Sequence, residues 1–370
     1  MATIVRSVAA GIEAATNPAK KPFIFNCWYV AAWATEITDN ILGRTLLNVP
    51  VAIYRQENGE VAAVLDACPH KFAPLSMGRR IGDVIQCGYH GLQFNGAGQC
   101  VHNPHGNKKI PPNARIPSFP VSERHGSIWI WLGQAELADE ALIPDFGFFL
   151  DPERKAVYGR TYVEGNYQLS IDNLMDLGHA MYLHRQTAGE FGEPECIHEV
   201  GQDGHRVWDR RLYPSLPLPA LMAERYKIPA GTPQDVSMDI EWIPGGLIQN
   251  DIMVAPVGKA RVGGKSLQGI HCLTPETEHT THYFYANVRN HSLEDSAVDE
   301  GLRKWQKQAL QDEDSAMAAA IEKNMQALKP INLHPVYLET DRALARVRRV
   351  IEQLIAREAS LRCVDDPVGE

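Results

Sequence analysis

Hydrophobic and polar positions alternate in two parts of the chain, as expected for β-strands. In the first part, residues 45–54 and 61–65 form two apolar runs around the turn-like Glu57-Asn58-Gly59, and residues 127–132 form a short, tryptophan-containing run. In the second part, the alternating runs predict antiparallel strands at 236–243, 247–257, 267–273 and 281–289. Both halves of the chain are therefore expected to contain a β-sheet.

A helical period appears only in the second half. Residues 166–182, 302–328 and 340–359 carry apolar side chains at helical spacing, with Leu344, Val347, Ile351 and Ile355 on one stripe of the last segment. Residues 214–233 contain five prolines and are expected to form a long loop. The second half should therefore combine a sheet with helices.

The length of the chain, 370 residues, is more than one hydrophobic core usually holds and indicates about two domains. Weak patterning near 143–147 places the boundary close to residue 150, which gives domains at 23–150 and 151–370. Residues 1–22 lack a long apolar block with a cleavage site. They are interpreted as an N-terminal extension and not as a signal peptide.

Composition narrows the class of function. The net charge is −9 and the pI is about 5.9, an acidic balance that disfavours nucleic-acid binding and an anionic membrane surface. The sequence has no run of 18 apolar residues that could span a bilayer. Seven cysteines, an odd number in a long chain, do not suggest a disulfide framework and favour a reduced, cytoplasmic protein.

Two short blocks carry soft metal ligands: Cys68-Pro69-His70 and Cys87-Gly88-Tyr89-His90, with sixteen residues between them. Two thiolates and two imidazoles could hold one zinc ion. They could also hold a two-iron cluster, with the cysteines on one iron and the histidines on the other, which is a Rieske centre. Cys100, His102 and His105 lie nearby and are interpreted as structural, because the four-ligand set is already complete.

A second candidate metal site lies in the segment from Asn173 to His184. His179 and His184 are five residues apart, so a helix interrupted around Gly178 could aim both side chains inward. Two imidazoles and one carboxylate form the facial triad of non-haem Fe(II) oxygenases. The carboxylate is expected from Asp314 on the later helix, with Asp312 as its rival.

The cysteine–histidine blocks, CPHKFAPLSMGRR and CGYHGLQFNGAGQC, resemble the cluster-binding loops of Rieske non-haem iron oxygenases. Within that family, the chain is similar to the vanillate and dicamba O-demethylase oxygenases through NCWYVAAW, CVHNPHGN, SIWIWLG, NLMDLGHAMYLH and LTPETEHTTHYFY. The resemblance covers almost the whole chain. It implies an α+β fold: an N-terminal all-β Rieske domain followed by a catalytic domain whose antiparallel sheet is covered by helices, a START-like helix-grip arrangement.

The same resemblance implies cofactors, partners and a reaction. Each chain would hold one [2Fe-2S] cluster and one mononuclear Fe(II). NAD(P)H and flavin would act only through a partner reductase or ferredoxin. The terminal oxygenase would form a head-to-tail homotrimer and use O2 to remove the methyl group of a methoxy-aromatic acid as formaldehyde. N-dealkylation, aryl-ether cleavage and ring dihydroxylation remain alternatives, as does, further away, an electron carrier or zinc module.

Individual residues acquire roles through this resemblance. Asp176 would link the two metal centres by bonding His179 and the His90 of a neighbouring subunit, and Asn173 would lie near the iron without ligating it. Asn250, His271 and Trp305 would fall where a carboxylated aromatic substrate binds. No Gly-x-Gly-x-x-Gly loop is present, so a fused nucleotide-binding reductase is not expected.

Overall fold

The structure is a computed structural model that describes residues 23–189, 194–331 and 334–364. The predicted extension at 1–22 lies outside the described residues. The chain divides into two compact units: the first reaches to Asp145 and includes Pro275–Thr277 and the end of the chain from Gln353 onward. The second runs from Phe146 to Thr274 and from Glu278 to Glu352. Among the described helices, none is both long and apolar enough to cross a membrane.

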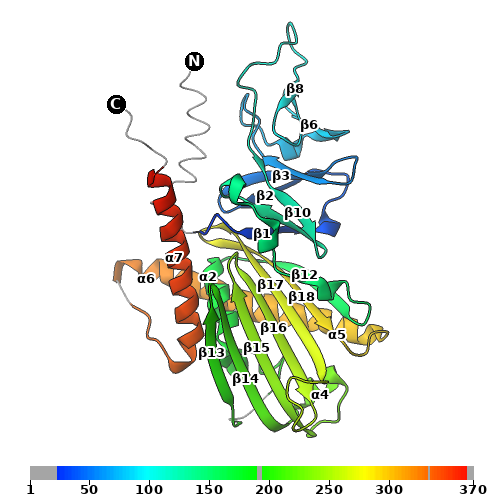
Figure 1. Ribbon diagram of the computed structural model, residues 1–370, viewed down its shortest axis with the longest axis vertical. Helices are drawn as coiled ribbons and strands as arrows, with labels where there is room; N and C mark the ends of the chain where they lie inside the picture. The colour runs from blue at the N-terminus through cyan, green and yellow to red at the C-terminus, as the bar shows by residue number, and fades with distance from the viewer. Residues whose placement is uncertain (1–22, 190–193, 332–333, 365–370) are drawn as a thin grey trace. The chain divides into compact units, whose positions relative to one another are not determined.

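The first unit consists of three small antiparallel sheets (Figure 1). Their orders are β1-β11-β10, β2-β3-β4-β9 and β5-β6-β7-β8. The strands are β1 (Trp28–Trp33), β2 (Leu42–Leu46), β3 (Val49–Arg55), β4 (Val61–Leu65), β5 (Arg79–Ile81), β6 (Val84–Gln86), β7 (Gln93–Phe94), β8 (Cys100–His102), β9 (Ser118–Phe119), β10 (Val121–Arg124) and β11 (Ser127–Trp131). The expected all-β architecture is confirmed for the N-terminal part of this unit, which ends at Asp145, whereas residues 353–364 are helical.

Two predicted strand runs of the first unit can be compared with its sheets. The run at 127–132 corresponds to β11, whose five residues are all buried. The apolar run at 45–54 is not one strand but parts of β2 and β3, which pair as a hairpin. Leu47 and Asn48 form its two-residue turn with φ values of 51° and 65°, as a type I′ turn requires at both central positions. Because Leu47 is apolar, the turn was hidden inside a hydrophobic run.

The second unit is built on a seven-stranded antiparallel sheet of order β12-β18-β17-β16-β15-β14-β13. The strands are β12 (Lys155–Val163), β13 (Ile197–Asp203), β14 (Arg206–Pro217), β15 (Pro233–Ile243), β16 (Leu247–Ala255), β17 (Lys265–Thr277) and β18 (Thr280–Arg289). The four predicted strands are confirmed as β15 to β18, whereas β12, β13 and β14 were not predicted.

The predicted long loop at 214–233 was wrong. The first part continues β14, and α4 (Ala220–Tyr226) follows it. Pro214 and Pro217 are tolerated in the strand because they lie beyond Leu212, where the pairing with β13 ends, and next to a bulge after Tyr213. The prolines of this segment therefore mark the end of β14 at Pro217 and the start of α4 after Pro219.

Helices cover one face of the large sheet (Figure 1). They are α2 (Tyr167–Met175), the short turns η7 (Leu177–His179) and α3 (Ala180–Leu183), α5 (Ser296–Gln306), the π-helical stretch η8 (Lys307–Ser315) and α6 (Ala316–Leu328); α7 (Arg342–Val364) is the last helix. The three predicted helices are confirmed in place, but two of them are interrupted. Both interruptions lie where the candidate iron ligands are found.

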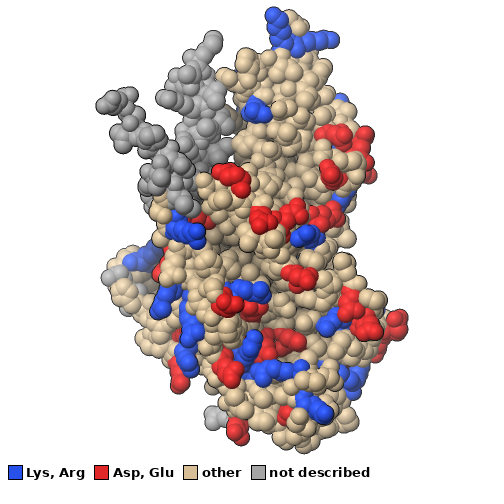
Figure 2. All heavy atoms as spheres, in the orientation of Figure 1, with Lys and Arg blue, Asp and Glu red and all other residues tan. Residues whose placement is uncertain are grey.

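Charged side chains of both signs are interspersed over most of the surface shown in Figure 2. Few of them lie over the part of the first unit that contains β6 and β8. The loops with the cysteine–histidine blocks belong to this sheet: one precedes β5 and the other joins β6 to β7.

Candidate metal centres and substrate pocket

The two cysteine–histidine loops of the first unit have the same backbone design. The carbonyl oxygen of Cys68 accepts a hydrogen bond from the N–H of Phe72 at 2.7 Å, and that of Cys87 accepts one from Gly91 at 3.0 Å. Phe72 and Gly91 both have positive φ values, 58° and 73°. Each loop thus closes over its own cysteine within four residues, which holds a Cys-x-His and a Cys-x-x-His block in equivalent turns.

The four expected cluster ligands lie in this unit as a close histidine pair and a close cysteine pair. The rings of His70 and His90 are 4.5 Å apart, and the thiols of Cys68 and Cys87 are both buried. Burial and then the neighbouring Cys87 thiol raise the pKa of Cys68 to about 11, although a backbone hydrogen bond opposes this. His70 is exposed and His90 partly exposed. Buried thiols below surface imidazoles suit a cluster with one inner and one outer iron.

The neighbouring candidates interact with the backbone of the loops. A ring nitrogen of His105 lies 2.8 Å from the carbonyl oxygen of His90, and the thiol of Cys100 lies 3.5 Å from the carbonyl oxygen of His102. These contacts support the second loop and the adjacent β8. They agree with a structural interpretation of Cys100 and His105.

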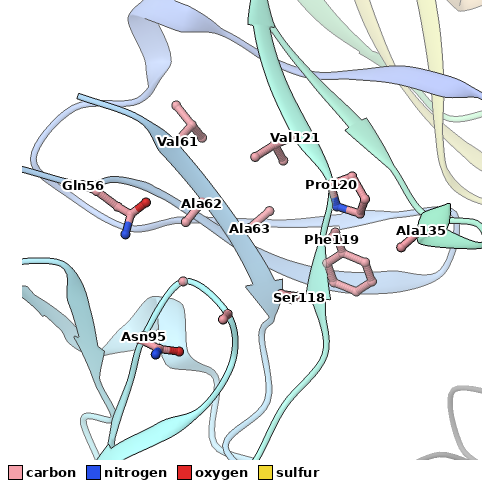
Figure 3. A pocket seen from close by; sticks show the side chains of 12 residues that line it. Gln56, Val61, Ala62, Ala63, Asn95, Ser118, Phe119, Pro120, Val121 and Ala135 are labelled. Atoms are coloured by element: carbon pink, nitrogen blue, oxygen red, sulfur yellow. The ribbon is translucent and has the colours of Figure 1, made fainter. Parts of the chain in front are cut away.

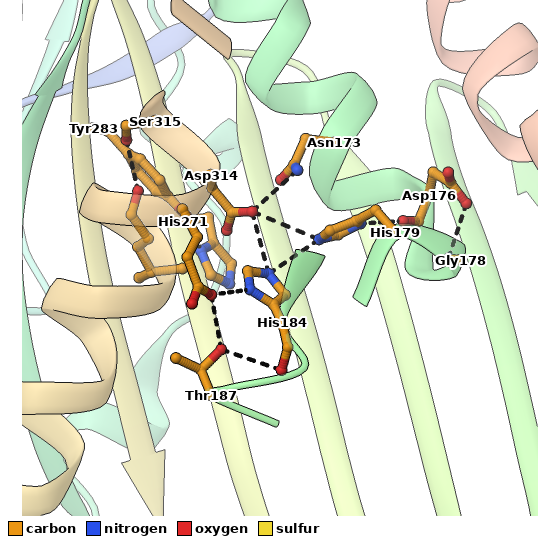
Figure 4. A network of polar contacts seen from close by, with 12 residues as sticks. Asn173, Asp176, Gly178, His179, His184, Thr187, His271, Tyr283, Asp314 and Ser315 are labelled. Atoms are coloured by element: carbon orange, nitrogen blue, oxygen red, sulfur yellow. Dashed lines mark hydrogen bonds and ion pairs between the residues drawn. The ribbon is translucent and has the colours of Figure 1, made fainter. Parts of the chain in front are cut away.

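The second unit brings His179, His184 and Asp314 together (Figure 4). The two Nε2 atoms are 3.2 Å apart, and Asp314 Oδ1 is 3.2 Å from Nε2 of His184 and 3.7 Å from Nε2 of His179. Ligand bonds of about 2.1 Å at right angles would separate the ligand atoms by about 3 Å, so the spacing fits one metal ion. Asp312 is exposed and outside this group.

Two breaks in helical structure produce this convergence. At Asp176 the backbone leaves the helix with φ −100° and ψ 90°, so η7 and α3 start in a new direction and carry His179 and His184 inward. Asp314 lies in the π-helical stretch η8, a conformation that is frequent at functional sites. The break predicted around Gly178 therefore lies two residues earlier, at Asp176.

Glu313 was not predicted, and the structure places it directly against the site. Its Oε2 lies 2.6 Å from Nδ1 of His184 and accepts a hydrogen bond from the Thr187 hydroxyl at 2.8 Å. Burial alone would lower the pKa of His184, but Asp314 and then Glu313 outweigh it and raise that pKa. A carboxylate on the far nitrogen of a ligating imidazole fixes its orientation. In the sequence, the acidic run at 312–314 was the signal that could have indicated Glu313.

Asn173 and Asp176 contact the site in different ways. The amide of Asn173 donates a hydrogen bond to Asp314 Oδ1 at 3.1 Å, without ligating geometry of its own. For Asp176, it is the carbonyl oxygen that contacts Nδ1 of His179. Its carboxylate accepts a hydrogen bond from the N–H of Gly178 at 2.9 Å and so caps η7. The expected carboxylate contact with His179 is therefore replaced, within this chain, by a backbone contact.

Asn250 and His271 converge above Gly269 on the inner part of the sheet. A Cβ atom on Gly269 would lie 1.8 Å from Asn250 Oδ1 and 2.9 Å from His271 Nε2, so the glycine leaves room for both side chains. These two atoms and Nε1 of Trp305 are buried without a hydrogen-bond partner in the described structure. His271 Nδ1 lies 2.6 Å from the Tyr283 hydroxyl, and burial lowers the pKa of His271 to about 4. Buried polar atoms without a partner are uncommon, and a bound ligand or water would satisfy these three.

A separate pocket lies in the first unit (Figure 3). Its volume is about 570 Å³, and it opens between β4, the β7–β8 turn and β9. None of its lining residues is titratable, so it offers no acid–base or metal chemistry. They are Gln56, Val61, Ala62, Ala63, Asn95, Gly96, Ala97, Ser118, Phe119, Pro120, Val121 and Ala135.

The chain matches two protein families. Residues 27–120 match the Rieske [2Fe-2S] domain, and residues 163–357 match the vanillate O-demethylase oxygenase C-terminal domain. These two ranges contain all the cysteines, histidines and carboxylates predicted above as metal ligands.

Similar proteins cover nearly the same length. The oxygenase component of dicamba O-demethylase from Stenotrophomonas maltophilia is 44% identical over 91% of this chain and 99% of its own. The oxygenase component of chloroacetanilide N-alkylformylase from Rhizorhabdus wittichii is 38% identical over 94% of this chain and 100% of its own. A crystal structure of dicamba monooxygenase with non-haem iron and dicamba is 43% identical, covers 91% of this chain and 99% of that chain, and has a TM-score of 0.82.

Proposed function

The chain belongs to the Rieske oxygenases with a vanillate O-demethylase-type C-terminal domain, and we propose that it demethylates a methoxylated aromatic acid. As a member, it is the oxygenase component of a multicomponent monooxygenase, with a Rieske [2Fe-2S] cluster and a mononuclear iron. Electrons come from NAD(P)H through a separate reductase or ferredoxin. A likeness to both an O-demethylase and an N-alkylformylase supports oxidative dealkylation in general.

The observation that carries the proposal is the convergence of His179, His184 and Asp314 in a buried site. Two imidazoles and one carboxylate leave open positions on an iron for oxygen. Glu313 would hold the His184 ring in its ligating orientation, and Asn173 would do the same for the Asp314 carboxylate. These residues are our assignment for the mononuclear iron, as Cys68, His70, Cys87 and His90 are for the cluster.

The polar groups above Gly269 would orient the substrate. Asn250 and His271 can donate hydrogen bonds to an acidic group on the ring, and the Trp305 indole can pack against an aromatic face. Held in this way, the methoxy carbon would face the iron-binding residues.

When bound, the two metal centres supply electron transfer and oxygen activation. The overall change consumes O2, two electrons and two protons, and inserts one oxygen atom into a methyl C–H bond of the substrate. The resulting hemiacetal breaks its C–O bond to give a phenol and formaldehyde, and the second oxygen atom leaves as water. The protein's own groups bind and orient the substrate and exclude bulk water from the buried site.

Assembly and location are also part of the proposal. Phe72, Met77 and Tyr89 are apolar and between 64% and 79% exposed next to His70 and His90, which supports contact of the cluster loops with another protein. We propose a head-to-tail homotrimer in which Asp176 of one subunit meets the cluster loops of the next. The described cysteines are free, which supports a reducing, cytoplasmic location.

The experiment is an assay of the loaded enzyme with a surrogate reductase, NADH and a panel of methoxybenzoates. We expect phenol and formaldehyde in equal amounts, dependent on O2. The same panel should include N-alkyl anilides and unsubstituted benzoates. Another aldehyde or a cis-diol as the main product would overturn O-demethylation in favour of N-dealkylation or ring dihydroxylation.

A further inference from the structure

Arg225, in the last turn of α4, lies against the indole proposed to line the substrate pocket. Its guanidinium carbon is 4.6 Å from the centre of the Trp305 ring, within cation–π range. Its Nη2 donates a hydrogen bond to the carbonyl oxygen of Thr187 at 3.0 Å. The Thr187 hydroxyl bonds Glu313, which in turn contacts His184. Arg225 is therefore connected to the surroundings of the iron-binding site.

Among the described residues, Arg225 forms no ion pair with an acidic side chain. Burial lowers its pKa, although the charge of the neighbouring, exposed Glu224 opposes this. An arginine nevertheless remains charged, and a desolvated cation without a counter-ion is costly. The buried arginines of the described structure are different, because each has a carboxylate partner: Arg44 has Glu36, Arg211 has Asp209 and Arg289 has Asp299.

The other polar groups of the proposed pocket supply no positive charge. Asn250 is a neutral amide, and the lowered pKa of His271 keeps its imidazole neutral at neutral pH. Asp314 is buried and Glu313 half-buried, and both add negative charge to this part of the unit. An anionic substrate would find hydrogen-bond donors at Asn250 and His271, but the attractive charge has to come from another residue.

We propose that Arg225 selects anionic aromatic substrates by placing its positive charge beside the acidic group of a ring that packs on Trp305. The ligand class is an aromatic ring with an oxyanion, either a carboxylate or a sulfonate. The inference rests on the proposed function, because it concerns the same pocket. It assigns Arg225 to specificity: the residue recognises the acid and takes no part in the oxidation.

Binding to the metal-loaded enzyme tests the proposal without turnover. The probes are the 2-, 3- and 4-methoxybenzoates, the matching methoxybenzenesulfonates and the neutral methoxybenzamides, titrated by calorimetry. The wild type should bind at least one carboxylate or sulfonate about tenfold or more tightly than its amide. Arg225→Gln should weaken binding of that anion about 10- to 100-fold and change binding of the amide by less than about twofold. Arg225→Lys, which keeps the charge, should restore part of the preference.

Arg210→Gln is the matched control, because Arg210 also stacks on a tryptophan, Trp208, at 5.3 Å, but is exposed. It should leave every affinity unchanged. The proposal is overturned if the wild type shows no preference for any anion, or if Arg225→Gln weakens the amide as much as the anion, since the residue would then be structural. If Arg225→Gln does not fold, Arg225→Lys decides: its preference for the anion should lie between no preference and the wild-type value, and an unchanged preference would contradict the role of Arg225.

The two proposals can fail separately. Selective binding of anions without formaldehyde from any methoxy probe would leave Arg225 in its role and remove O-demethylation. If the wild type instead binds benzoates and benzamides equally well and forms equal amounts of formaldehyde from both, O-demethylation stands and the role of Arg225 is wrong. Iron content measured in each preparation excludes loss of metal through Thr187 and Glu313 as the cause of weaker binding.

Discussion

The two candidate metal centres are constructed in opposite ways. The cluster loops take all four ligands from a short stretch of chain, and each loop closes on its own cysteine. The iron site takes His179 and His184 from an interrupted helix and Asp314 from a distant π-helical stretch. The first arrangement depends on local sequence. The second depends on how helices pack over the sheet, so the two sites should respond differently to substitution.

They also differ in exposure. At the cluster loops the thiols are buried but His70 is exposed, beside exposed apolar side chains. At the iron site His184 and Asp314 are 8% and 6% exposed, and Glu313 and Asn173 bond them from behind. The first arrangement suits electron entry from another protein, whereas the second suits chemistry protected from water.

The largest effect should come from removing one ligand from each site. Asp314→Ala is expected to lose the mononuclear iron and all product formation while the cluster's absorbance remains, because the remaining ligands are two imidazoles alone. Cys87→Ser should lose the cluster's absorbance and keep the mononuclear iron. Metal analysis and visible spectroscopy measure both. Asp312→Ala is the control and should keep the iron. If Asp312→Ala loses the iron and Asp314→Ala keeps it, the wrong carboxylate has been assigned.

A second test concerns the connection between the two sites. Asp176→Asn should keep both centres loaded and the fold intact, because asparagine caps a helical turn as well as aspartate does. Product formation in a single turnover of pre-reduced enzyme should fall by orders of magnitude, since the substitution removes the carboxylate charge that we propose to link neighbouring subunits. Asp312→Asn provides the same charge change at an exposed position. Wild-type rates in Asp176→Asn, or a fully active monomer, would contradict the inter-subunit route.

Glu313→Gln should weaken mononuclear iron binding about 10- to 100-fold, the usual effect of removing the partner of a ligating imidazole. Iron affinity can be measured by competition with a chelator. Glu322→Gln is a matched control, because Glu322 contacts Nδ1 of His279 at 2.8 Å in the same unit, away from the iron ligands. Equal iron affinity in the wild type and Glu313→Gln would show that Glu313 does not support iron binding through His184.

The smallest effect is expected at His271. His271→Ala should raise the KM for a methoxybenzoate about tenfold, the value of one hydrogen bond to a charged group. Because burial keeps the pKa of His271 at about 4, the wild-type imidazole stays neutral from pH 7.5 down to about 5.5. Its contribution should therefore be constant over that range, whereas an ordinary histidine would gain charge below about pH 6.5 and bind an anion more tightly. If the wild-type KM decreases as the pH is lowered while the KM of His271→Ala stays constant, the His271 imidazole is not neutral over this range.

Much of the fold could be predicted from the sequence where one sheet face is consistently apolar. Strands β15 to β18 were found in this way, whereas β14 was missed because its buried face includes Asp209 and Arg211. Two buried charges and two prolines removed the alternation that normally reveals a strand. Asp209 and Arg211 form an ion pair within β14 itself, and the His198 ring on the neighbouring β13 contacts the other oxygen of Asp209 at 2.7 Å.

The candidate ligand blocks of both sites can be recognised in the amino-acid sequence, because cysteine–histidine spacing in a closed loop and the histidine pair of a broken helix are local properties. Only the tertiary structure brings Asp314, and not Asp312, to the histidine pair, since the π-helical stretch turns one inward and the other to solvent. It also brought Glu313 to His184, and Arg225 to Trp305. Such contacts join residues from different elements, and no spacing along the chain encodes them; they follow from how the helices pack on the sheet.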